Sequence, residues 1–344
     1  MFYKSIVTVT SRFSRGVTVR NMSSGHKVYV TRSDMPECGV QLLQKECEVK
    51  MWNKPSPVSR EDFLKNVAGS EGIYCSLTDK IDKELLDAAG PTLKVVATIS
   101  VGYDHIDVQE CKKRGIRIGY TPDVLTDATA ELTLALLLCT SRRLPEAIHE
   151  AKSGGWVSWA PTWMTGPGLA DATVGIVGFG RIGQAVARRV KSFNTAKILY
   201  FNRSERPEAK ELGAIKVTFD EILAQSDFII CCAALVPETK ELFNKAAFEK
   251  MKKTAVFINT SRGGTVDQNA LIEALKNNTI RAAGLDVTTP EPLPLDSPLF
   301  KLKNCVVLPH IGSASIEARN IMSDLTARNI LAALKGTEMP AELK

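Results

Sequence analysis

Three side chains that suit proton transfer to an anionic substrate each follow a short apolar run of the sequence. Arg262 lies in a glycine-flanked turn, Glu291 stands between two prolines, and His310 follows residues 306–308. A guanidinium can hold a carboxylate, and an imidazole can protonate a carbonyl oxygen on which charge develops. A carboxylate beside His310 would orient the ring and favour its protonated form. We therefore expect these three side chains to share one site.

Each of these residues also has an interpretation that involves no catalysis. A lone arginine in such a turn is usually a surface or phosphate contact, and a histidine after a strand is as often structural as functional. The positions of the three residues favour the shared site, because ligands of open α/β sheets bind at the carboxyl ends of strands.

A glycine motif predicts where a dinucleotide binds. Gly178-x-Gly180-x-x-Gly183 follows the β-branched run 173–177 and precedes a helical pattern. Gly178 permits a tight turn, Gly180 lets a pyrophosphate approach the backbone, and Gly183 lets the helix pack closely on the strand. The N-terminus of the helix offers free N–H groups to the phosphates.

The end of the second strand of this unit indicates which dinucleotide is bound. Enzymes that use NAD usually carry Asp or Glu about 20 residues after the motif, where the acid binds the ribose hydroxyls. Asn202 takes that place here, and Arg203, Ser204, Glu205 and Arg206 follow it. A neutral Asn202 does not repel a 2′-phosphate, and the two guanidinium groups can bind one. Glu205 could instead neutralise one arginine on a solvated turn, but we expect NADPH.

Alternating short strands and helices are predicted to position these motifs. Residues 26–30, 95–100 and 116–118 are predicted strands of a first parallel sheet. A second run of β-α units is predicted over 172–308, with strands near 174–177, 198–201, 227–232, 255–259, 282–286 and 306–308.

Two segments between these runs predict contact with another domain or subunit. Residues 123–144 form a helical pattern whose apolar face is predicted to be Leu132, Ala135, Leu136 and Cys139. A helix this apolar needs cover on most sides. The loop 153–168 carries Trp156, Trp159 and Trp163, and aromatic residues favour interfaces. The alternative is that the tryptophans hold the loop on its own domain.

Composition excludes several classes of protein. The 344 residues carry 44 basic and 38 acidic side chains, an excess too small for a nucleic-acid binder. No apolar stretch approaches the roughly 20 residues of a membrane span. Eight cysteines without metal or disulfide spacing indicate a reducing compartment and no metal site. Residues 1–25 are basic and free of acids, as in a mitochondrial presequence, a disordered tail or an alternative start. We expect a cytosolic protein, with the mitochondrial matrix as the alternative.

Taken together, the motifs resemble those of the D-isomer-specific 2-hydroxyacid dehydrogenases over about residues 26–344. The resemblance rests on the glycine motif and on residues 100–107, 119–127, 261–264, 284–292 and 309–313, which come in the family's order. The tryptophan loop, residues 235–239 and residues 339–343 are similar to an animal branch that reduces glyoxylate and hydroxypyruvate. The resemblance implies a homodimer that reduces these acids to glycolate and D-glycerate with NADPH.

The resemblance also implies a role for each motif residue. Arg262, Glu291 and His310 would be catalytic, with His310 as general acid, Glu291 as its support and Arg262 binding the substrate's carboxylate and carbonyl. Further substrate contacts would come from the backbone of Val101 and Gly102, from Asp286 and Ser313, and from Trp159 of a neighbouring subunit. The cofactor would contact Gly178, Gly180, Arg181, Ile182, Gly183, Arg203, Ser204, Arg206, Leu235, Thr260, Asp286 and Gly312. His105 would be structural.

The implied architecture is α/β, with two doubly wound parallel-sheet domains. A Rossmann cofactor domain, residues 125–313, would be inserted into a flavodoxin-like substrate domain made of residues 26–124 and 314–344, and domain closure would exclude water. Two alternatives stay open. One is an NAD-linked D-lactate or D-3-phosphoglycerate dehydrogenase, which usually has an acid where Asn202 stands. The other is a dinucleotide-sensing corepressor that binds peptides.

Overall fold

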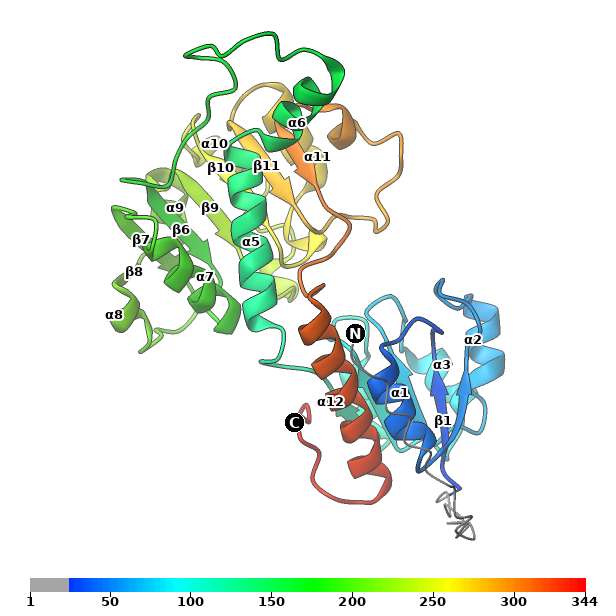
Figure 1. The fold of residues 1–344 in the computed structure, drawn as a ribbon. Coiled ribbons are helices and arrows are strands. Elements are labelled where there is room, and N and C mark those ends of the chain that lie inside the picture. The colour runs from blue at the N-terminus through cyan, green and yellow to red at the C-terminus, as the bar shows by residue number, and fades with distance from the viewer. Residues whose placement is uncertain (1–24) are drawn as a thin grey trace, which may run out of the picture.

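Two parallel sheets form the framework of the computed structural model, which describes residues 25–344 (Figure 1). The first sheet has the flavodoxin-like order β2-β1-β3-β4-β5. Its strands are β1 (Lys27–Val30), β2 (Glu48–Met51), β3 (Gly72–Cys75), β4 (Val95–Thr98) and β5 (Arg117–Gly119). The helices between them are α1 (Glu37–Gln44), α2 (Arg60–Val67), α3 (Lys83–Ala89) and α4 (Val108–Lys113).

The second sheet has seven strands in the order β12-β11-β10-β9-β6-β7-β8. They are β6 (Thr173–Val177), β7 (Lys197–Phe201), β8 (Ala214–Lys216), β9 (Phe228–Cys231), β10 (Val256–Asn259), β11 (Ala282–Leu285) and β12 (Cys305–Val307). The strand order reverses between β6 and β9, as in dinucleotide-binding folds, and places a crevice beside the start of α7. The predicted fold class is confirmed.

The helices of the second half cover both faces of this sheet. They are α5 (Thr126–Ser141), α6 (Leu144–Ser153), α7 (Arg181–Lys191), α8 (Ala209–Leu212), α9 (Phe219–Gln225), α10 (Lys245–Lys250) and α11 (Gln268–Lys276). Three short 3-10 helices lie at Pro237–Thr239, Gly263–Thr265 and Pro298–Lys301. Among residues 25–344, no helix has the length and apolar character needed to cross a membrane.

The chain passes between the two sheets twice. It leaves the first sheet at the start of α5 and returns to it through α12 (Ile316–Leu334), which packs on α1 and β4 (Figure 1). The central strands β3, β4, β9 and β10 are buried along their whole length. Such two-sided burial is expected where helices cover both faces of a parallel sheet. The loops after these strands are therefore anchored by rigid elements on both sides of the crevice.

Some details of the fold were not predicted from the sequence. On α5, Ala135 is exposed and Leu132 and Cys139 are half-buried, so the cover expected for this apolar face from another domain or subunit stays a prediction. The face of α5 that is buried in this chain includes Thr133, whose hydroxyl donates to the carbonyl of Thr129 at 2.7 Å and so can be buried without penalty. The edge strand β8 was not predicted, because its three residues are mostly exposed and carry little apolar signal. Residues 1–24 lie outside the described residues, so the predicted targeting role and cellular location stay predictions.

Candidate active site

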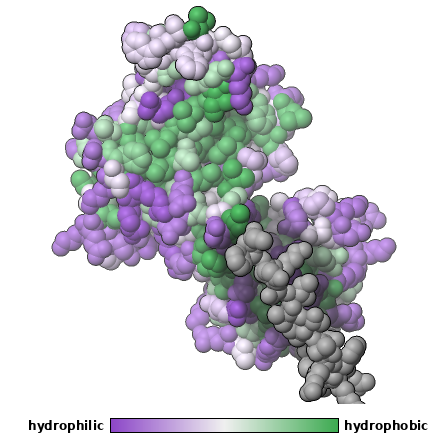
Figure 2. Space-filling view, in the orientation of Figure 1, coloured by the Kyte–Doolittle hydropathy of each residue, from purple (hydrophilic) through white to green (hydrophobic). Residues whose placement is uncertain are grey.

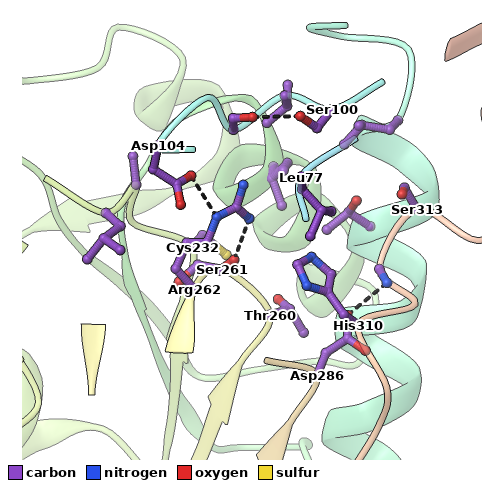
Figure 3. A pocket seen from close by; sticks show the side chains of 18 of the residues that line it. Leu77, Ser100, Asp104, Cys232, Thr260, Ser261, Arg262, Asp286, His310 and Ser313 are labelled. Atoms are coloured by element: carbon purple, nitrogen blue, oxygen red, sulfur yellow. Dashed lines mark hydrogen bonds and ion pairs between the residues drawn. The ribbon is translucent and has the colours of Figure 1, made fainter. Parts of the chain in front are cut away.

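A cavity of about 250 Å³ lies where the carboxyl ends of the two sheets face each other (Figure 3). Loops after β4, β9, β10, β11 and β12 supply most of its walls, and the first turns of α7 and α12 close its ends. Of the residues predicted to bind substrate or cofactor, those that line the cavity are Val101, Gly102, Ile182, Leu235, Thr260, Arg262, Asp286, His310, Gly312 and Ser313. The convergence expected at the strand ends therefore occurs.

His310 and Glu291 form a hydrogen-bonded pair at one wall of the cavity. The Nδ1 of His310 lies 2.8 Å from Oε2 of Glu291, and the backbone N–H of Thr288 donates to Oε1 at 3.0 Å. Burial works to raise the pKa of Glu291, but its interactions with His310, with the backbone of Thr288 and with Arg262 together outweigh it, and the net shift is downward. Glu291 therefore stays ionised at neutral pH, fixes the ring through Nδ1 and leaves Nε2 for a ligand.

Asp286 holds the loop that carries His310. Its carboxylate accepts the backbone N–H groups of Ile311 at 2.8 Å and Gly312 at 2.7 Å, and its carbonyl accepts the N–H of His310 at 2.9 Å. His310 has a left-handed backbone with φ of 55°, a conformation that costs energy in a residue with a side chain. Burial raises the pKa of Asp286. The three hydrogen bonds explain how the loop keeps this conformation.

Arg262 faces His310 across the cavity and is held from two directions. Its Nε donates to Oδ1 of Asp104 at 2.9 Å, and its Nη1 donates to the carbonyl of Ser261 at 2.9 Å. Its Nη2 lies against Gly102, where an added Cβ would stand 1.7 Å away. The guanidinium thus lies beside the 101–102 backbone, and together they suit one carboxylate.

The glycine motif has the geometry of a dinucleotide site. A Cβ on Gly178, whose φ is 91°, would meet the backbone of Ala233, and a Cβ on Gly183 would lie 2.2 Å from the carbonyl of Gly178. Only glycine permits this close packing of α7 on β6. A Cβ on Gly180 would meet open space, so a ligand can approach the backbone at this position. Arg181 pairs with Asp123 at the start of the interdomain connection.

The turn after β7 fits a 2′-phosphate. The amide of Asn202 accepts the N–H of Phe179 at 3.2 Å and donates to the carbonyl of Ser204 at 3.1 Å, so this neutral side chain joins the turn to the glycine motif. Arg203, Ser204 and Arg206 are exposed. In the described part of the chain, no ion pair involves either arginine, and Glu205 does not neutralise them. Two available guanidinium groups beside a neutral residue suit an anion such as a 2′-phosphate.

Several predicted residues lie away from the cavity. Trp159 does not line it and is 82% exposed, and Trp156 and Trp163 are 63% and 40% exposed. Trp156 and Trp159 therefore do not hold the loop on its own domain, whereas more than half of Trp163 is covered. Within the described residues, the cysteines at positions 38, 75, 111, 139, 231, 232 and 305 form no disulfide. Within residues 25–344, no cluster of His, Cys, Asp and Glu could hold a metal ion.

Sequence reasoning did not assign a role to Asp104, which pairs with Arg262. The sequence did single out this segment, because Asp104 belongs to the motif 100–107 on which the family resemblance partly rests. The neighbouring His105 is largely buried, its Nε2 lies 3.1 Å from the hydroxyl of Thr98, and burial lowers its pKa to about 4. A neutral histidine in that environment is consistent with the structural role expected for it.

The comparisons with known proteins agree with this geometry. The model of the D-isomer specific 2-hydroxyacid dehydrogenase NAD binding domain matches residues 134–312. The glyoxylate reductase/hydroxypyruvate reductase of Homo sapiens is 56% identical over 320 residues, which cover 92% of this chain and 98% of that protein. The glyoxylate reductase of Thermococcus kodakarensis is 47% identical over 322 residues, which cover 92% of this chain and 95% of that protein.

One solved structure adds information on ligands. The NADPH-dependent glyoxylate/hydroxypyruvate reductase of Sinorhizobium meliloti was solved in complex with NADP and malonate. It is 33% identical to this chain, superposes with a TM-score of 0.80, and the match covers 92% of this chain and 96% of that one.

Proposed function

Since this chain belongs to the D-isomer-specific 2-hydroxyacid dehydrogenases, we propose that it uses NADPH to reduce glyoxylate to glycolate and hydroxypyruvate to D-glycerate. The observation that carries the proposal is the His310–Glu291 pair, which faces Arg262 in a cavity next to the glycine motif. Both substrates present a carboxylate beside a reactive carbonyl. The site provides a cation for the first group and a proton donor for the second.

The residues of this chain divide the reaction between them. Arg262 and the backbone N–H groups of Val101 and Gly102 bind the carboxylate and orient the carbonyl. Bound NADPH supplies the hydride. His310 donates a proton from Nε2 to the carbonyl oxygen, while Glu291 holds Nδ1 and stabilises the charged ring. Asp286 keeps the His310 loop in place.

Cofactor preference gives a direct test of the proposal. The wild-type protein should oxidise NADPH with glyoxylate and with hydroxypyruvate and should use NADH far less efficiently. Replacing Arg203 and Arg206 together with alanine should raise the KM for NADPH by about 100-fold, because each charge-assisted hydrogen bond to a 2′-phosphate is worth roughly 1.5–3 kcal/mol. The KM for NADH, which lacks that phosphate, should change little. Steady-state kinetics with both cofactors measures this.

A control variant shows whether the effect is specific to arginines in the turn after β7 or follows from the loss of any positive charge. Arg188→Ala removes an exposed arginine on the same domain, in α7, and should leave both KM values unchanged. A wild-type preference for NADH would contradict the cofactor assignment. It would instead favour the NAD-linked alternative, D-lactate or D-3-phosphoglycerate dehydrogenase. Absence of turnover with either acid would favour the corepressor alternative.

The proposal includes a homodimer in which Trp159 reaches the active site of the neighbouring subunit. Its support is the apolar surface that a single chain leaves uncovered. Figure 2 shows such surface around α5, and Leu144 and Ile148 in α6 are 44% and 53% exposed. The 82% exposed Trp159 lies in the loop that follows α6. A second copy of the chain would cover these residues.

Trp159→Ala tests this contact through substrate size. Removing the ring should raise kcat/KM for phenylpyruvate relative to glyoxylate by about 10-fold, because pocket contacts discriminate substrates by size on this scale. Trp156→Ala, in the same loop, should leave the ratio unchanged. Sedimentation velocity on all three proteins should give the mass of two chains. An unchanged ratio in Trp159→Ala, or a monomer in the wild type, would count against the proposed contact.

A further inference from the structure

An ion pair between Asp104 and Arg262 joins the two halves of the active site. Asp104 lies in the turn after β4 of the first sheet, and Arg262 lies in the turn after β10 of the second, 158 residues further along the chain. Oδ1 of Asp104 accepts from Nε of Arg262 at 2.9 Å, and both side chains are more than half buried (Figure 3). Burial works to raise the pKa of Asp104, but the lowering contributions, of which those of Arg262 are the largest, outweigh it and the net shift is downward. Asp104 is therefore ionised at neutral pH.

The pair determines which edge of the guanidinium is available to a ligand. Nε is occupied by Asp104, and Nη1 donates to the carbonyl of Ser261 at 2.9 Å. Because the guanidinium is planar, two bonds on different nitrogens fix its orientation. Nη2 then lies against Gly102 and makes no hydrogen bond to any residue from 25 to 344. It is the nitrogen placed to bind a substrate oxygen beside the 101–102 backbone.

The loop that presents Asp104 is itself braced. The hydroxyl of Ser100 donates to the carbonyl of Gly102 at 2.6 Å and lies 2.8 Å from the hydroxyl of Thr98, which contacts the ring of His105 at 3.1 Å. These side chains are largely buried. Buried networks whose members are all bonded hold one conformation. Asp104 therefore projects from a fixed loop, and a fixed loop can orient a partner from another domain.

We infer that Asp104 is a positioning residue of this enzyme: it orients Arg262 so that Nη2 and the N–H groups of Val101 and Gly102 converge on one substrate carboxylate. The inference rests on the proposed function. Asp104 acts through Arg262, since it contacts Nε of the guanidinium and not the substrate. It helps to hold the carboxylate in the ground state and the transition state alike, so its loss is expected in KM more than in kcat.

Substitutions at Asp104 test the inference by distinguishing the orientation of Arg262 from the negative charge of Asp104. Asp104→Ala should raise the KM for glyoxylate by about 30-fold with kcat within about 5-fold, because a misoriented binding group weakens the complex. Asp104→Asn keeps an oxygen that accepts from Nε, so its KM should rise only about 3-fold. Oxamate is a carboxylate analogue that is not reduced. Calorimetry should show that it binds the NADPH complex most tightly in the wild type, less tightly in Asp104→Asn and most weakly in Asp104→Ala. NADPH affinity should stay within about 2-fold of wild type.

Two controls show whether the effect is specific to Asp104 and whether it acts through Arg262. Asp87→Asn breaks an ion pair with Arg114 on the same half of the protein but far from the cavity, and should leave the KM unchanged. In the Arg262→Ala background, Asp104→Ala should have no further effect, because the group it orients is gone. An unchanged oxamate affinity in Asp104→Ala, or additive effects of the two substitutions, would overturn the inference. Absence of turnover in the wild type would instead refute the proposed function, since oxamate binding is measured separately.

Discussion

Replacing His310 with asparagine should lower kcat for the reduction of glyoxylate by about 10³-fold, within the range that general acids contribute. The variant keeps no group that can protonate the carbonyl oxygen from this wall of the cavity. Asparagine is the suitable replacement because residue 310 has a φ of 55°, which asparagine tolerates better than most residues. The fold should therefore be retained, as a thermal melt would show. Stopped-flow or steady-state assays with saturating NADPH measure the loss.

A comparison of substitutions identifies the proton donor. His310 delivers the proton to the carbonyl oxygen, so His310→Asn removes the donor altogether. Glu291→Gln removes the charge that stabilises the protonated ring and should lower kcat less than His310→Asn does. His26→Gln, at an ion pair with Glu71 in the first sheet, should leave the rate unchanged. A wild-type rate in His310→Asn would rule out the proposed mechanism.

Those parts of the site that correspond to a local sequence pattern were predictable from the sequence. The glycine motif is a contiguous signal, and the close contact of Gly183 with the carbonyl of Gly178 is what its spacing implies. Predicting that His310 and Glu291 lie together required one further rule. Both follow strands of the same parallel sheet, and the carboxyl ends of such strands share one edge.

Features that depend on how the two sheets pack were not predictable. Asp104 and Arg262 are 158 residues apart and belong to different sheets, so no periodicity or spacing relates them. The burial of Thr133 on α5 was not predictable for a similar reason. Its hydroxyl lies 2.7 Å from the hydroxyl of Thr260 after β10, and no local pattern indicates a contact between residues so far apart in the chain.

Arg262 should be irreplaceable, even by lysine. Arg262→Ala should lower kcat/KM for glyoxylate by about 10³-fold, because it removes a charge-assisted hydrogen bond to the substrate, worth roughly 1.5–3 kcal/mol, and leaves the carboxylate of Asp104 unpaired in the site. Arg262→Lys should recover less than about 10-fold of that loss. An ammonium is a single point of charge and lacks the fork geometry that lets Arg262 hold Asp104, the carbonyl of Ser261 and a substrate oxygen at once.

Chemical rescue distinguishes geometry from charge in this prediction. Adding guanidine hydrochloride to Arg262→Ala should restore part of kcat/KM, since the free cation can occupy the space between Asp104 and the 101–102 backbone, whereas methylammonium should not. Arg281→Lys, at an exposed arginine just before β11, should match the wild type. If Arg262→Lys were as active as the wild type, a simple positive charge would suffice for carboxylate binding. The oriented edge of the guanidinium would then have no part in catalysis, and the role inferred for Asp104 would fail with it.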